Sequence, residues 1–276
     1  MMSEITIKKI QSWKNKKFFS AITAYDFTTA KIINKSKIPI VLVGDSASMT
    51  SYGYSSTIPI SMDEILLISR AVSRAISSSL VVGDMPFGSY QHSASVAVKN
   101  AARFLKEGRV SAIKLEGGVL VQNQISKIVR SGIPVMGHVG LTPQSVNQFS
   151  GYSVQGKDLT SAQKIFNDAR AVEDAGAFSV VLECIPEELA KKITSSLSIP
   201  TIGIGSGKFC DGQIQVLHDI LGLDDDFSPR HAKRYLNLQS SILSALEKYN
   251  DEVVKNKFPQ KIHSTNYKSN IIDKLQ

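Results

Sequence analysis

The chain has 276 residues, 42% of them hydrophobic and 20% charged, with a mean hydropathy of −0.03. This composition supplies a large buried core and excludes disordered and fibrous proteins. Its two cysteines are too few for a disulfide scaffold, and no apolar run approaches the roughly 18 residues of a membrane span. Residues 1–17 contain charge but no apolar core of a secretory signal, so we expect a cytoplasmic protein without membrane contact.

Most of the formal net charge of +8 lies in one stretch, because residues 1–37 carry eight lysines and only two acidic residues. No aromatic residues are interleaved with these lysines in the pattern of single-strand binders. We therefore interpret the stretch as a solvated surface and expect no nucleic-acid partner; a polyanion site is the alternative.

Short apolar, β-branched runs alternate with helical stretches along the chain. The runs predict strands at residues 18–23, 39–43, 80–82, 112–115, 134–137, 178–182 and 201–204, with a weaker eighth at 216–221. Helices are predicted over residues 62–77, 93–106, 161–175 and 187–196. Ser61 and Glu64 form a capping-box pattern at the start of the first of these helices.

This alternation predicts parallel strands joined by right-handed crossovers. Seven or eight such units fit a closed (β/α)8 TIM barrel better than an open doubly wound sheet. We expect one α/β barrel domain over residues 1–260 and a polar C-terminal tail over residues 261–276.

Ionisable residues follow or end five of the predicted strands. They are Asp45 after VLVG, Asp84 after VVG, Glu116 after AIKL, His138 after VMG and Glu183 at the end of VVLE. The carboxyl ends of barrel strands meet on one face, where the loops build the active site. Five repeats of one placement predict a shared pocket.

Three carboxylates in one pocket repel one another unless a cation is present. Asp45, Asp84 and Glu116 offer hard oxygen ligands without a cysteine or histidine cluster, which favours Mg²⁺ with water in part of its coordination sphere. The alternative is that these acids cap the helices that follow them.

Lys114 lies two residues before Glu116, so both side chains point to the same side of the strand. We expect Lys114 to hold a substrate carboxylate or a developing enolate; pairing with Glu116 alone is the alternative. The apolar surroundings of Glu183 suit a general base, although it could also be a ligand or a core acid. His138 either binds a substrate oxygen or satisfies the core, and GIGSG at 203–207 is a weak anion-nest pattern.

Six collinear segments resemble the ketopantoate hydroxymethyltransferase family, and the resemblance runs from about residue 22 to about residue 259. They are VGDSASMTSYGYSSTIPIS (43–61), GDMPFGSY (83–90), IKLEGG (113–118), GHVGLTPQSVNQFSGYSVQGK (137–157), VLECIPEELAKKIT (181–194) and IGIGSGKFCDGQIQVLHDILG (202–222). The chain departs from the family pattern at Ser48, Tyr54 and Ser206, and none of these changes removes an ionisable group.

The resemblance implies a phosphoenolpyruvate-mutase-like barrel, a homodecamer, and one Mg²⁺ per subunit. It implies transfer of a hydroxymethyl group from 5,10-methylenetetrahydrofolate to 3-methyl-2-oxobutanoate, which gives 2-dehydropantoate in pantothenate and coenzyme A synthesis. By residue, it implies Asp45, Asp84 and Glu116 as metal ligands and Glu183 as the proton acceptor. It also implies a substrate site that comprises Asp45, Ser46, Asp84, Lys114 and His138.

Two other functions stay open, of which only the first keeps the metal-dependent barrel chemistry. One is a C–C lyase or phosphonomutase acting on another 2-oxo acid, which folate-dependent activity would exclude. The other is an inactive scaffold or a polyanion-binding protein, which the full set of matched ionisable residues argues against.

Overall fold

The computed structural model describes residues 5–149, 151–224 and 229–266. The described residues fall into two compact units: one extends to Leu217 and includes Pro229–Ala232, and the other contains the remainder. The predicted division at residue 260 stays a prediction.

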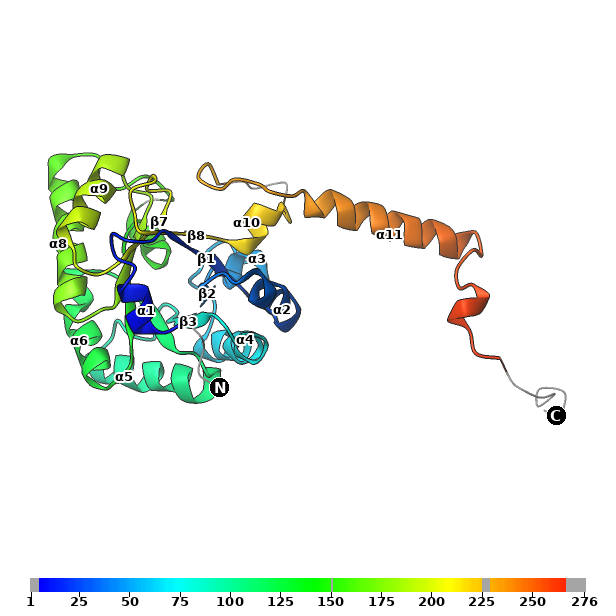
Figure 1. Cartoon of the computed structure of the whole chain (residues 1–276), viewed down its shortest axis with the longest axis horizontal. Helices are drawn as coiled ribbons and strands as arrows, with labels where there is room; N and C mark the ends of the chain where they lie inside the picture. Colours follow the sequence, from blue (N-terminus) through cyan, green and yellow to red (C-terminus); the bar gives the residue numbers. More distant parts are fainter. Residues whose placement is uncertain (1–4, 150, 225–228, 267–276) are drawn as a thin grey trace. The chain divides into compact units, whose positions relative to one another are not determined.

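Within the described residues of the first unit, eight parallel strands close a barrel in the order of the sequence (Figure 1). The strands are β1 (Phe19–Thr23), β2 (Ile40–Val43), β3 (Leu80–Asp84), β4 (Ala112–Glu116), β5 (Val135–Gly140), β6 (Ser179–Glu183), β7 (Thr201–Ile204) and β8 (Gly212–Gln215). Pairing of β8 with β1, from Phe19 opposite Gly212 onward, completes the ring. The predicted (β/α)8 barrel is confirmed.

Strand residues fill the inside of the barrel at every second position, as the two-residue period of a strand requires. Ile40 and Leu42 of β2 and Leu80 and Val82 of β3 are inward-facing pairs of this core. β2 and β3 are buried on both faces because helices cover the outside, which explains their continuous apolar runs.

A short helix, α1 (Ile7–Gln11), packs against the same core. Its Ile10 is fully buried among the inward-facing strand residues, and Trp13 packs against the cluster. Phe19 and Phe178, which lie at or just before the first residue of a strand, belong to this cluster too. The basic N-terminal stretch therefore contains the residues that close the barrel at the amino ends of its strands.

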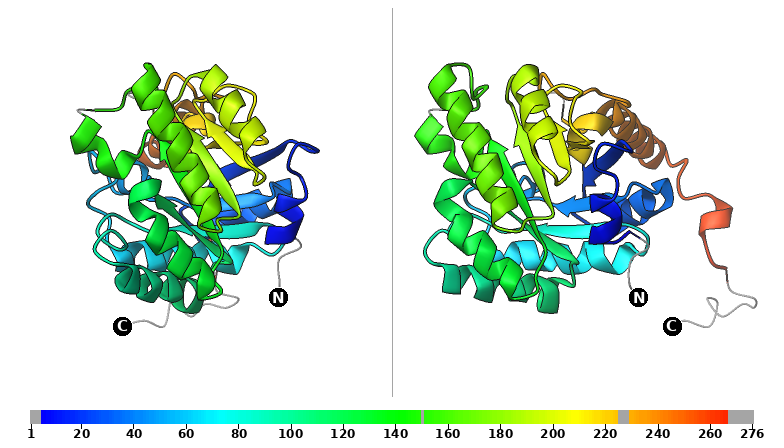
Figure 2. Two further views of the ribbon diagram at one scale, coloured as in Figure 1. Left: turned by 90° about the vertical axis from the view of Figure 1, so that its left-hand side faces the viewer. Right: turned by 60° about the vertical axis from the view of Figure 1, so that its left-hand side comes forward.

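The outer helices ring the barrel (Figure 2). α4 packs against β2 and β3, α6 against β5, and α8 against β5 and β6. The helical segments of this unit are α1, α2 (Phe27–Ser36), α3 (Ala47–Thr50), α4 (Met62–Ala75), α5 (Ala94–Arg103), the π-helical η1 (Phe104–Gly108), the 3-10 segments η2 (Val119–Val121) and η3 (Pro143–Ser145), α6 (Gln122–Arg130), α7 (Val146–Phe149), α8 (Leu159–Asp174) and α9 (Glu187–Ser196). The capping box at α4 forms as predicted, with Ser61 and Glu64 bonding to each other's backbone amides.

The eighth predicted strand was placed wrongly. The strand is Gly212–Gln215, whereas the predicted segment 216–221 contains helix α10 (Leu217–Leu221). The residues GQIQ alternate between buried and partly exposed positions, so this strand lacks the continuous apolar run that marks the others. The apolar residues that suggested a strand belong to α10, where Leu217 is buried.

The second unit contains most of α10, together with α11 (Leu238–Val254) and the short η4 (Lys261–His263). None of the described residues of α11 is buried, although Ile242, Leu243, Leu246 and Tyr249 are large and apolar. The described part of the sequence contains no helix that is long and apolar enough to cross a membrane.

Candidate active site

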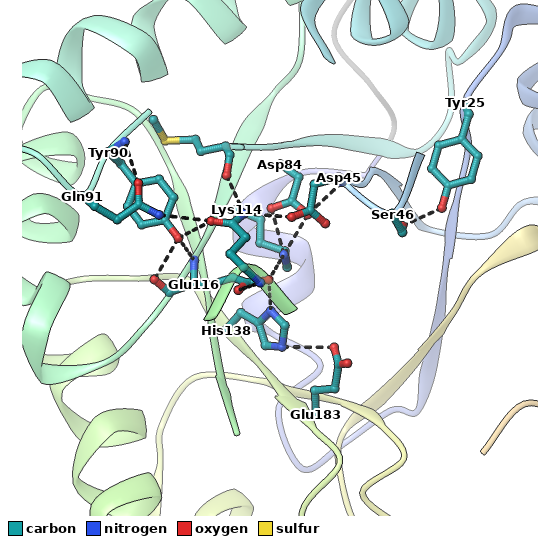
Figure 3. Close-up of polar contacts among 12 residues, drawn as sticks. Tyr25, Asp45, Ser46, Asp84, Tyr90, Gln91, Lys114, Glu116, His138 and Glu183 are labelled. Atoms are coloured by element: carbon teal, nitrogen blue, oxygen red, sulfur yellow. Dashed lines mark hydrogen bonds and ion pairs between the residues drawn. The ribbon is translucent and has the colours of Figure 1, made fainter. Parts of the chain in front are cut away.

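Four ionisable side chains meet at the carboxyl ends of neighbouring strands (Figure 3). Asp84 ends β3, Lys114 and Glu116 are close to or at the end of β4, and His138 lies in β5. The strand register places Asp84 opposite Lys114 and Glu116 opposite His138. Asp45, two residues beyond β2, joins the group because its backbone amide lies 3.3 Å from Asp84 Oδ2.

The centre of the cluster is an ion pair between Lys114 and Asp84. Lys114 Nζ lies 2.8 Å from each carboxylate oxygen of Asp84, and the two side chains are only 5% and 1% exposed. Glu116 Oε1 is farther from the ammonium, at 3.8 Å. The alternative in which Lys114 pairs with Glu116 alone is therefore wrong.

Burial and mutual repulsion raise the pKa values of two acids. For Asp45, burial is the larger cause, the Asp84 charge adds to it, and the pKa lies well above the usual range. Burial also raises the pKa of Asp84, although Lys114 opposes the shift. Burial alone would likewise raise the pKa of Glu116, but His138 and Lys114 outweigh it, so the Glu116 carboxyl has a lowered pKa and stays ionised.

His138 lies between two carboxylates. Its Nδ1 is 3.4 Å from Glu116 Oε1 and its Nε2 is 3.2 Å from Glu183 Oε2, although neither nitrogen makes a hydrogen bond of regular geometry. Burial and the Lys114 charge lower the pKa of His138, but the two carboxylates outweigh them and raise it to about 9. At neutral pH the ring is therefore an imidazolium that connects Glu116 to Glu183.

Glu183 stands at the edge of the cluster, with 17% of its side chain exposed. It ends β6, and Cys184 then turns the chain with a φ of 47°, a left-handed conformation that few residues other than glycine adopt. Gly140 of β5 faces this corner, where a Cβ atom would lie 2.3 Å from the Glu183 carbonyl oxygen. Gly140 thus allows β5 and β6 to lie close together beside Glu183, the most accessible acid of the cluster.

None of the three predicted metal ligands caps a helix. The caps of α3 and α5, the helices that follow β2 and β3, are Ser46 and Ser93, and Gly118 precedes η2. The capping alternative for Asp45, Asp84 and Glu116 is therefore excluded.

The donor set fits a hard cation. Among the residues that the structure describes, no three His, Cys, Asp or Glu side chains are grouped closely enough to hold one ion directly. Mg²⁺ needs no such cage, because it usually takes one or two carboxylates and keeps water in its other positions. Glu116 Oε1 is buried without a hydrogen bond, with the cationic Lys114 and His138 at 3.8 and 3.4 Å, so it is free to coordinate an ion.

Ser46, the remaining predicted site residue, lies beside Asp45 but faces another partner. Its hydroxyl is 2.7 Å from the hydroxyl of Tyr25, and Figure 3 shows this pair beside the acidic cluster. The serine of GIGSG, Ser206, is buried and donates to the carbonyl of Leu182, which ties β7 to β6 next to Glu183.

Sequence reasoning missed two buried polar residues of the cluster, Tyr90 and Gln144. The Tyr90 hydroxyl contacts Gln144 Oε1 at 2.8 Å, and Gln144 donates to Asp45 and Glu116. Both residues are uncharged and lie in loops, so neither strand ends nor charge marked them. Both fall inside the family-like segments 83–90 and 137–157, which were the available signal.

Comparison with known proteins agrees with these motifs. The model of the family described as ketopantoate hydroxymethyltransferase matches residues 4–261. Curated relatives named 3-methyl-2-oxobutanoate hydroxymethyltransferase include those of Dehalococcoides mccartyi strain CBDB1, 48% identical over 98% of each chain, and Campylobacter jejuni subsp. jejuni serotype O:6, 51% identical over 95% of each chain.

Solved structures share the fold at low identity. A phosphonopyruvate hydrolase matches with a TM-score of 0.62 and 13% identity, covering 99% of this chain and 94% of that one. A phosphoenolpyruvate phosphomutase from Streptomyces platensis subsp. rosaceus also gives 0.62, with 10% identity over 91% and 88% of the two chains. The expected phosphoenolpyruvate-mutase-like barrel is confirmed. With the matched family model and the full-length relatives, these findings establish that the chain is a transferase and belongs to the ketopantoate hydroxymethyltransferase family.

Proposed function

We propose that this enzyme transfers a hydroxymethyl group from 5,10-methylenetetrahydrofolate to 3-methyl-2-oxobutanoate, and so forms 2-dehydropantoate for pantothenate and coenzyme A synthesis. The names of the full-length relatives support the acceptor and the group transferred. The observation that carries the chemistry is the buried acid–lysine cluster joined through His138 to the more accessible Glu183.

Mg²⁺ is the proposed cofactor, one ion per subunit, held by Asp45, Asp84 and Glu116 directly or through water. Support comes from the hard oxygen donors and from Glu116 Oε1, which is buried without a hydrogen bond. A structural neighbour, a phosphonopyruvate hydrolase, was solved in complex with oxalate and Mg²⁺. When bound, the ion supplies Lewis acidity at the 2-oxo group and so makes the neighbouring C3–H more acidic.

Lys114 stabilises the negative charge that develops on the 2-oxo oxygen when the proton leaves. An ammonium has three donors, and two of the present contacts go to one carboxylate, so a substrate oxygen can share it. Burial strengthens this interaction because little water screens it. Ser46, Asp45, Asp84 and His138 complete the proposed oxo-acid site.

Glu183 removes the C3 proton, either directly or through one water. It is the most accessible acid of the group, and its contact with His138 orients the carboxylate. The enolate carbon then forms a C–C bond with the methylene carbon of the folate as the first of that carbon's two C–N bonds breaks. Water supplies the hydroxyl group as the second C–N bond breaks, and the protons from C3 and from water end on the two nitrogens of tetrahydrofolate, which balances the transfer.

We also propose that the enzyme works in the cytoplasm as a homodecamer, without nucleic acid or membrane. The exposed apolar residues of α11 support contact with further copies of the chain, because a helix with no buried residue gains stability by covering that face.

The test is a product assay with purified protein, 3-methyl-2-oxobutanoate and methylenetetrahydrofolate, in Mg²⁺ and then in EDTA. We expect 2-dehydropantoate to form in Mg²⁺ and to disappear in EDTA or when the folate is omitted. A folded protein that gives no 2-dehydropantoate under any of these conditions would refute the proposed reaction.

A further inference from the structure

Gln144 lies at the centre of the hydrogen bonds around the acidic cluster. It is in η3, in the loop that follows β5, and only 3% of its surface is exposed. Its backbone amide donates to Glu116 Oε2 at 3.1 Å. Its side-chain Nε2 donates to Asp45 Oδ2 at 2.8 Å and to the carbonyl of Met85 at 2.9 Å.

The other end of the same amide is also held. Gln144 Oε1 accepts from the Tyr90 hydroxyl at 2.8 Å and from Gln91 Nε2 at 3.2 Å. A glutamine amide has two donor hydrogens and two acceptor lone pairs, and these four contacts use all of them. Rotation of the amide by half a turn would set donor against donor and acceptor against acceptor, so the side chain has one orientation.

This orientation holds one oxygen of Asp45, and the buried side chain anchors the backbone amide that contacts Glu116. Gln144 takes one oxygen of Asp45 through its side chain and one oxygen of Glu116 through its backbone. The second oxygen of Glu116, Oε1, is left without a hydrogen bond. Asp45 follows β2, whereas Glu116 ends β4, and two carboxylates repel each other, so fixed donors are needed to hold them in place before a cation binds.

We propose that Gln144 is a positioning residue of the metal site, which orients Asp45 and Glu116 so that each keeps an oxygen for Mg²⁺. This inference rests on the proposed function for the identity of the ion, but not for the contacts. Gln144 itself touches neither substrate nor metal in this role. It acts through the two carboxylates.

The test measures binding of Mn²⁺, a hard ion with similar ligand preferences, to the metal-free full chain by electron paramagnetic resonance. Gln144→Met keeps an unbranched side chain but removes the side-chain amide that binds Asp45, while the backbone amide that donates to Glu116 remains, and Gln144→Asn keeps the side-chain amide on a shorter stem. We expect the Kd for Mn²⁺ to rise about 10- to 100-fold in both variants. Gln163→Met is the matched control, because Gln163 is exposed on α8 and bonds only to Asn167 among the described residues.

A merely structural role would lower the thermal stability of the variants and leave the Kd for Mn²⁺ of the folded protein unchanged. Wild-type affinity in folded Gln144→Met, or in Gln144→Asn if the methionine variant does not fold, overturns the inference while the proposed function stands. Failure of the wild-type chain itself to bind Mn²⁺ overturns both the inference and the proposed metal site.

Discussion

Replacing Lys114 by methionine removes the buried cation that the acidic cluster surrounds. The methionine has a similar length and no charge, so the change isolates the ammonium group. Asp84, 1% exposed, loses two contacts of 2.8 Å, and the Glu116 carboxylate loses its neighbour at 3.8 Å. What remains in the metal-free protein is a set of buried acids with His138 as the nearest cation.

The expected loss follows from burial. Removing one partner of a buried ion pair costs about 3–5 kcal/mol, because the other charge stays desolvated and unpaired. Lys164→Met is the control: Lys164 Nζ lies 2.7 Å from Asp168, and the two side chains are 69% and 11% exposed. Because the lysine is largely hydrated and Asp168 keeps its bond from the Val119 amide, we expect a loss of at most about 1 kcal/mol.

Urea unfolding in EDTA, followed by the fluorescence of Trp13, measures both variants. Trp13 is the single tryptophan and packs against the barrel core, so it reports on the unit that holds the site. We expect the free energy of unfolding to fall several times more for Lys114→Met than for Lys164→Met. Saturating Mg²⁺ should restore much of the loss, because the ion supplies the missing countercharge.

The pH dependence provides an internal check. Without Lys114, burial and the Glu116 charge raise the pKa of Asp84 further, opposed by the hydrogen bond from the Asp45 backbone amide. A raised pKa in the folded state contributes stability that is present at low pH and is lost as the pH rises through that pKa. The defect of Lys114→Met should therefore shrink in acid. Equal losses in Lys114→Met and Lys164→Met would refute the description of a charge-balanced cluster.

Two further predictions concern His138, within the acidic cluster, and Asp211, just before the first residue of β8. In EDTA, the free energy of unfolding of the wild-type chain should fall between pH 6.5 and 9 by on the order of 3 kcal/mol more than that of His138→Gln. The reason is that the pKa of His138 is raised from 6.5 to about 9, so its contribution to stability is lost across that range. Parallel pH profiles for the two proteins would contradict this. Asp211→Ala should lower the free energy of unfolding by about 3–5 kcal/mol, because Asp211 accepts from Lys14 Nζ at 2.9 Å and from the backbone amides of Asn15 and Thr201 in a buried site. The Kd for Mn²⁺ should not change. A weaker Kd would show that the two ends of the barrel are coupled.

The barrel could be predicted from the sequence because seven of its strands are buried over all or most of their length. Such strands, for example β2, carry unbroken apolar runs, and their helices carry caps such as Ser61. β8 could not be found in this way, because its outer residues are partly exposed and its single isoleucine gives no run. The role of α1 was equally hidden, since a charged stretch gives no sign that Ile10 fills the end of a barrel.

In the candidate site, too, some residues could be predicted from the sequence and others could not. Asp84, Glu116 and Glu183 could be located because a charge at the end of an apolar strand stands out in a sequence. The partner of Lys114 could not, because strand alternation points to Glu116 while the register between strands places Asp84 opposite the lysine. Gln144 and Tyr90 join the cluster through the conformation of their loops and through hydrogen bonds between uncharged groups, and neither can be predicted from one sequence.

The proposed chemistry begins with removal of the C3 proton, so exchange of that proton tests it most directly. 3-Methyl-2-oxobutanoate would be incubated in D₂O with the enzyme and Mg²⁺, without folate, and deuterium at C3 followed by NMR. We predict rapid exchange by the wild-type chain, no exchange in EDTA, and a rate at least about 100-fold lower in Glu183→Gln. Glu188→Gln, an exposed change in α9, should exchange normally. Exchange by Glu183→Gln at the wild-type rate would contradict the assignment of Glu183 as the base, and no exchange by the wild-type chain would contradict the enolising site itself.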